Sequence, residues 1–190
     1  MNDATAGPRD PFVAAWVATV VDVPLYTVIG GACAYLGAQV WEMLTGVEGE
    51  ARVGVDDTEA AVLTVTALII AVGIAAVAHT IGRHLHARTA EASPARAAGA
   101  FALMGGTLGL IPAGMVAAGS DDPAALAFVA IAIVLPCASV AALTRMMLPR
   151  IAASETAVTG FAIAAVLCVL LACALLAMVW VTWPDVDRAF

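Results

Sequence analysis

The three histidines of this chain lie in a single stretch, HTIGRHLHAR, which follows a long apolar run. On a helix His79, Arg83 and His86 are four and three residues apart, and they therefore share one face. The fixed charge of Arg83 between the two imidazoles disfavours a metal cation, and His84 and His86 point in different directions. We therefore predict no metal site here. The stretch is typical of the end of a membrane-spanning helix, where cations complement the helix C-terminus and anionic headgroups.

Asp22 and His79 lie inside apolar runs, and ionisable residues of this kind are costly in a membrane and often functional. A helix break at Pro24 would place Asp22 near the interface as a helix cap, and the alternative is an ion or proton role. His79 lies about one turn inside its span and needs a partner. If a functional centre exists, we expect it to be the polar cluster of Asp22, His79 and Arg83, binding an anionic headgroup or relaying a proton.

No catalytic motif accompanies these residues. Histidines occur in only one span, which argues against a serine–histidine intramembrane protease and against a bis-histidine haem from one chain. Asp22 has no second intramembrane aspartate to face. The acidic chain lacks a basic stripe, which argues against nucleic-acid binding. We expect no cofactor, and we consider an enzyme less favoured than a non-enzymatic protein. The cysteines form no CxxC pair and are interpreted as small buried hydrophobes: Cys33, Cys137, Cys168 and Cys173.

The composition is that of a membrane protein. Of its 190 residues, 63% are hydrophobic and 12% are charged, and the mean hydropathy is +0.99. The apolar residues form continuous blocks of roughly 20 or more, long enough to cross a hydrocarbon core of about 30 Å as helices. We predict an all-α, polytopic membrane protein, a bundle of about five transmembrane helices that forms a single domain over residues 1–190. The expected spans are about 24–44, 60–82, 98–118, 124–147 and 156–183.

The first apolar block, from about Pro11 to Leu44, is too long for one perpendicular crossing. A helix of this length would measure about 50 Å, against a core of about 30 Å. Because proline lacks a backbone donor and clashes with the preceding turn, Pro24 is the natural break. We favour a short N-terminal interfacial helix over Pro11–Val21, followed by a crossing helix from Pro24. The alternative is one tilted, kinked helix.

Small residues and prolines predict how the later spans pack. Gly105 and Gly109 form a GxxxG pair, which lets helix backbones approach closely in lipid. We expect this pair to serve internal packing rather than a dimer interface. Pro112 and Pro136 lie within the third and fourth spans and are expected to kink them.

Charge predicts the orientation. If the N-terminus and the 83–97 and 145–155 linkers share one side, that side collects six of the eight arginines, and the other side most of the acids. By the positive-inside rule the arginine side is cytoplasmic, so five spans place the C-terminus outside. The tryptophans at the outer ends of the spans agree with this orientation: Trp41, Trp180 and Trp183.

These features name no specific activity. The sparse polar groups within the spans favour a transport component or an accessory subunit of a cell-membrane complex. Its partners would be the lipid bilayer and other proteins, or a second copy of the chain. The alternative is a membrane-embedded enzyme or lipid-binding protein acting at the cytoplasmic face.

The orientation can be tested with a reporter fused after Phe190. Because arginines and tryptophans segregate to opposite sides, we expect a reporter that works only outside the cytoplasm to be active there. A matched fusion in the 83–97 linker should be inactive. Cytoplasmic activity of the C-terminal fusion would contradict the five-span topology.

Overall fold

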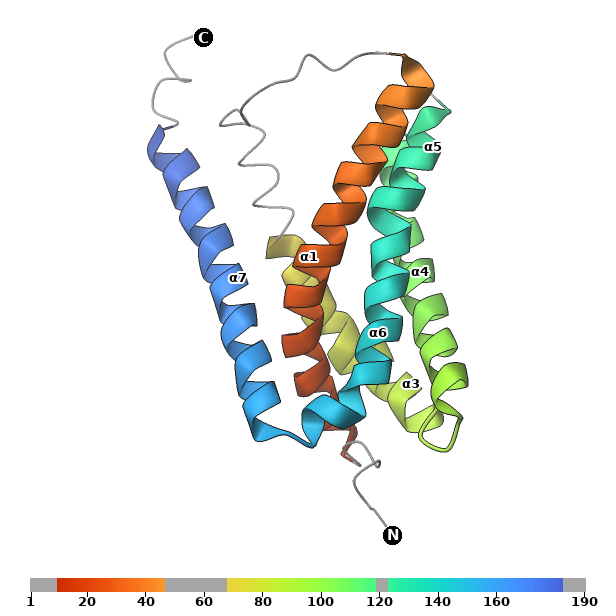
Figure 1. The fold of residues 1–190 in the computed structure, drawn as a ribbon, viewed down its shortest axis with the longest axis vertical. Helices are drawn as coiled ribbons and strands as arrows, with labels where there is room; N and C mark the ends of the chain where they lie inside the picture. The colour runs from red at the N-terminus through yellow and green to blue at the C-terminus, as the bar shows by residue number, and fades with distance from the viewer. Residues whose placement is uncertain (1–9, 47–67, 119–122, 183–190) are drawn as a thin grey trace.

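The computed structural model describes residues 10–46, 68–118 and 123–182, and in these ranges all regular structure is helical (Figure 1). The predicted all-α architecture with five membrane-spanning helices is confirmed. The segments long and apolar enough to cross a membrane are Pro11–Thr45, Leu68–Arg88, Pro94–Met115, Ala124–Ala152 and Glu155–Met178. The named elements are α1 (Pro11–Thr45), η2 (Ala78–Gly82), α3 (Arg83–Arg88), α4 (Pro94–Ala118), α5 (Ala124–Val129), η3 (Ala130–Val134), α6 (Leu135–Ala152) and α7 (Glu155–Thr182).

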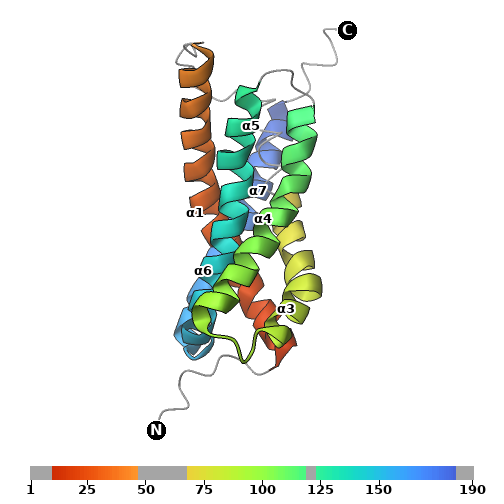
Figure 2. The ribbon, with the colours of Figure 1, turned by 90° about the vertical axis from the view of Figure 1, so that its right-hand side faces the viewer.

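The helices run up and down between two ends of the bundle. The start of α1, the α3–α4 turn and the α6–α7 turn lie at one end, as Figures 1 and 2 show. The ends of α1, α4 and α7 and the start of α5 lie at the other. The linkers that the positive-inside rule assigned to one side of the membrane therefore lie at the same end of the bundle. We call this the arginine end.

Helix α1 corrects one expectation. It is a single continuous helix through Pro24, so the separate interfacial helix expected over Pro11–Val21 is wrong, and the alternative of one long helix holds. Its lower part runs obliquely to its upper part in Figure 2. A membrane helix tolerates proline where neighbouring helices and local adjustments satisfy the freed backbone group.

Both ends of α1 have clear local causes. The N-cap residue Asp10 accepts a hydrogen bond from the backbone N–H of Phe12 at 2.8 Å, and Pro11 occupies the first turn, where no donor is needed. Gly46 ends the helix in the left-handed region, at φ 64°, which glycine adopts without a steric cost.

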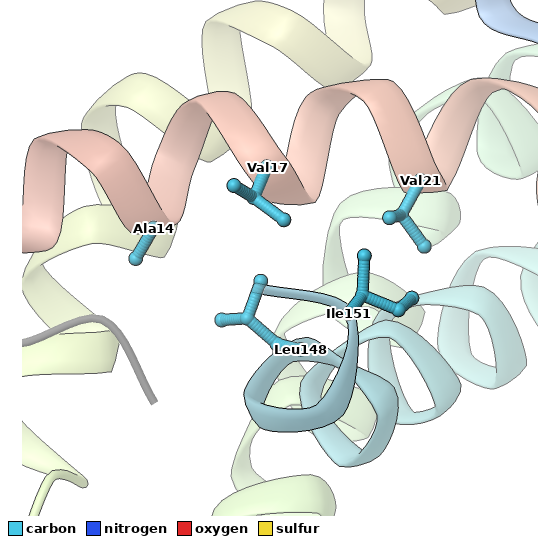
Figure 3. Close-up of a cluster of buried hydrophobic side chains, with 5 residues drawn as sticks. All are labelled: Ala14, Val17, Val21, Leu148 and Ile151. Carbon is cyan, nitrogen blue, oxygen red and sulfur yellow. The ribbon is translucent and has the colours of Figure 1, made fainter. Parts of the chain in front are cut away.

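A hydrophobic cluster holds the first turns of α1 against α6 (Figure 3). Partly buried residues from the start of α7, including Phe161, pack against the same cluster. Because these contacts lie before Pro24, they stabilise the part of α1 that we expected to lie apart in the interface. The buried members of the cluster are Ala14, Val17, Val21, Leu148 and Ile151.

Small residues bring the helices into close contact. A Cβ atom at Gly105 of α4 would clash with the carbonyl oxygen of Cys137 on α6, and one at Gly109 would lie 3.1 Å from the Cβ of Cys137. On the other side of the bundle, a Cβ at Gly37 of α1 would lie 3.2 Å from the Cβ of Ala132. Backbone approach at these glycines determines how closely α1 and α4 pack on the fourth span.

The two mid-span prolines behave differently. Helix α4 continues through Pro112. In the fourth span a π-helical segment, η3, immediately precedes the helix that carries Pro136. Such a segment is a common way to accommodate a residue that interrupts the hydrogen-bond ladder.

The close contact at Gly105 can be tested with two alanine substitutions in α4. Gly105→Ala forces a Cβ against a backbone carbonyl, and we expect overpacking to destabilise the protein by about 1–3 kcal/mol. Gly114→Ala is the matched control, because no atom of the described residues lies within 4 Å of its added Cβ. Thermal unfolding in mild detergent compares the two, and equal stabilities would contradict the α4–α6 contact.

Candidate polar site between helices α1 and α6

Asp22 lies on the face of α1 that meets α6. The hydroxyl of Thr144, a buried residue of α6, donates a hydrogen bond to Asp22 Oδ1. Thr144 is eight residues before the end of α6, about 12 Å along the helix axis. The expectation that Asp22 caps a helix is wrong, because α1 does not break at Pro24. Asp22 instead bridges two helices.

A second polar contact lies one turn farther along α1. The thiol of Cys137 is 3.9 Å from the hydroxyl oxygen of Tyr26, within hydrogen-bonding range for sulfur. Tyr26 and Asp22 are four residues apart on α1, and Cys137 and Thr144 are seven apart on α6, so each pair shares a helix face. We call these four residues the polar seam.

Five threonine hydroxyls in or at the end of helices bond to the backbone of their own helix. Each donates to the carbonyl four residues earlier, at 2.6–2.9 Å, so each is satisfied within its own helix. The donors are Thr19, Thr27, Thr45, Thr80 and Thr89.

His79 lies in the π-helical segment η2 and packs against the first turns of α1. Its imidazole centroid is 4.6 Å from the ring centroid of Trp16 and 5.7 Å from that of Phe12. Its Nε2 is buried and has no hydrogen-bond partner among the residues that the structure describes. Both aromatic side chains are about half exposed, as expected for rings near a membrane interface. The neighbours of His79 are therefore aromatic.

The structure does not join the three members of the expected polar cluster. Among the described residues, no hydrogen bond or ion pair links Asp22 to His79 or to Arg83. Trp16, the neighbour of His79, precedes Asp22 by six residues, about 9 Å along α1. Asp22 accepts a hydrogen bond from α6, and His79 packs against the first turns of α1.

Arg145 is a residue whose position the sequence did not reveal. The expected fourth span and the expected 145–155 linker overlap at Arg145, and α6 continues beyond it to Ala152. The guanidinium carbon of Arg145 lies 5.9 Å from the ring centroid of Phe101 on α4, a cation–π geometry. Its Nε is buried, and within the described part of the chain it has no hydrogen-bond partner.

The expectations for the tryptophans and the cysteines agree with the structure only in part. Trp41 packs edge to face on Phe128 of α5, with centroids 6.2 Å apart, whereas the side chains of Trp180 and Trp183 lie outside the described residues. All four cysteines are unpaired. Cys33 is buried as expected, but Cys173 is exposed on the surface of α7.

The chain matches no protein-family model, and no curated protein and no solved structure matches it. The assignment of a role therefore rests on the geometry of the seam and on the arrangement of charges.

The seam predicts a specific loss of stability. Thr144→Val keeps the shape of the side chain but removes the donor to Asp22, and we expect a loss of about 1 kcal/mol, as for interhelical hydrogen bonds in membranes. Thr144→Ser should retain most of the stability. The control is Thr159→Val on the exposed face of α7. Unfolding in detergent measures all three, and equal effects of Thr144→Val and Thr159→Val would refute the structural role of the pair.

Proposed function

We propose that this chain is a multi-pass protein of the cell membrane, with its N-terminus in the cytoplasm and its C-terminus outside. In that membrane the chain acts as a transport component or as an accessory subunit of a membrane complex. The polar contacts between α1 and α6 favour the accessory subunit. The orientation is supported by the six arginines that the sequence assigns to the arginine end and its linkers.

The observation that carries this proposal is the pairing within the polar seam. A complete transporter of charged solutes needs polar groups in the membrane that are free to contact the solute. Here the carboxylate of Asp22 is held by Thr144, and the hydroxyl of Tyr26 lies against Cys137. The threonine hydroxyls described above are bonded to their own helices. The two contacts of the polar seam join α1 to α6, which suits a subunit whose task is structural.

The surface of the bundle is consistent with a subunit embedded among lipids and other proteins. Helix α7 packs on α1 and α6 chiefly through its first turns, with Phe161 at the hydrophobic cluster. Farther along, it exposes large apolar side chains, including Leu167 and Leu171. Such a face suits a bilayer and leaves room for a neighbouring membrane protein.

The substitution Asp22→Asn separates the structural role from an ion or proton role. The amide oxygen of asparagine can still accept the hydrogen bond from Thr144, but the side chain cannot carry charge. We expect the tagged full-length chain, cross-linked in its own membranes, to purify with a partner in fixed proportion. Asp22→Asn should leave that proportion unchanged.

The control is Glu42→Gln, which removes an exposed carboxylate at the other end of α1. A chain that purifies alone and conducts ions in vesicles, with conduction lost in Asp22→Asn and kept in Glu42→Gln, would overturn the accessory role.

A further inference from the structure

Arg145 is a charged side chain that lies within α6. Its position is seven residues before the end of α6, about 10 Å along the helix axis. The guanidinium carbon lies over the ring of Phe101 on α4, 5.9 Å from the ring centroid. Among the described residues, no carboxylate forms an ion pair with it, and its buried Nε has no acceptor. A charge at this depth is costly unless an anion compensates it.

The carboxylate of Asp22, on the neighbouring helix α1, accepts a hydrogen bond from another residue of α6. Asp22 accepts its hydrogen bond from Thr144, the residue immediately before Arg145. Successive residues of an α-helix point about 100° apart. Thr144 therefore faces α1, while Arg145 faces α4 and Phe101. The fold thus holds a carboxylate and a guanidinium on different sides of one helix instead of pairing them.

The position of Arg145 indicates which anion it meets. It lies toward the arginine end of the bundle, where α3, the start of α4 and the end of α6 bring further cations: Arg83, Arg88, Arg96 and Arg150. A long arginine side chain near a helix end extends toward the headgroup region. Its planar fork binds the oxygens of a phosphate in pairs, and basic sites between transmembrane helices bind anionic headgroups.

We propose that Arg145, seated on Phe101 between α4 and α6, binds the phosphate of an anionic membrane lipid in the leaflet at the arginine end. Phe101 holds the guanidinium by its ring face and leaves the edge of the fork for the phosphate oxygens. A free phosphate ion shares this chemistry, and the test below separates the two sources. This site is independent of the proposed accessory role, because it requires no protein partner.

The test uses the purified full-length chain in a neutral detergent, titrated with dioleoylphosphatidylglycerol and followed by native mass spectrometry. We expect Arg145→Gln to weaken binding about tenfold, the loss typical of a charge-assisted hydrogen-bonded contact. Arg150→Gln, the matched control, removes an exposed charge from the same helix and should weaken binding less than about twofold. Equal losses in the two variants would overturn the proposal in favour of diffuse attraction.

Two further measurements keep the proposal falsifiable. Dioleoylphosphatidylcholine, which carries the phosphate but no net charge, should bind more weakly than the glycerol lipid, and millimolar inorganic phosphate should not displace the lipid. Displacement by inorganic phosphate would show a free-anion site and contradict the lipid assignment. If Arg145→Gln fails to fold, Arg145→Lys keeps the charge but loses the planar fork. Unchanged lipid binding by Arg145→Lys would contradict the proposed geometry.

Discussion

No water reaches the hydrocarbon core of a bilayer, so each polar group there must find its partner within the protein or in a lipid headgroup. Helices satisfy the backbone, and a threonine such as Thr19 satisfies its hydroxyl on the preceding turn of its own helix. The carboxylate of Asp22 is paired differently, with a donor on another helix. Thr144 supplies that donor, and the contact relates one position of α1 to one position of α6.

The apolar packing around the Asp22–Thr144 contact requires the same alignment of α1 on α6. Val21, next to Asp22, is fully buried and belongs to the cluster that includes Leu148, one turn beyond Thr144 on α6. In the other direction along α1, the small residues at Gly30 and Gly37 leave room for the ring of Tyr26 and for the fourth span. Polar pairing and apolar packing thus select the same alignment of α1 on α6. Helix α4 then packs on the other side of α6 through its own glycines.

The same arrangement separates charge. Helix α6 directs Thr144 and its bound carboxylate to one side, and the guanidinium of Arg145 to the other, onto Phe101. The charge of Arg145 is stabilised partly by the ring face of Phe101 and partly by an anion that binds it. The proposed accessory role and the proposed lipid site are therefore compatible, because the first rests on the α1–α6 side of the bundle and the second on the α4–α6 side.

The sequence by itself determined the number and type of the spans. Apolar blocks of about 20 residues in lipid can form little other than helices, because only helices satisfy each segment's own backbone. The sequence did not determine the course of α1. Pro24 breaks an isolated helix, but Val21 and its neighbours pack on Leu148 and keep the chain helical through the proline.

The sequence also did not determine which side chains the candidate residues contact. Asp22 and Thr144 are 122 residues apart, and nothing near either residue specifies that α1 faces α6. The sequence left Arg145 at the boundary between a span and a linker, whereas α6 continues to Ala152 and places Arg145 against Phe101 of α4. Local sequence patterns indicate the helix period and the length of each apolar block, because both depend on neighbouring residues. The meeting of distant side chains depends on which helices pack together and in what register, and only the tertiary structure decided that.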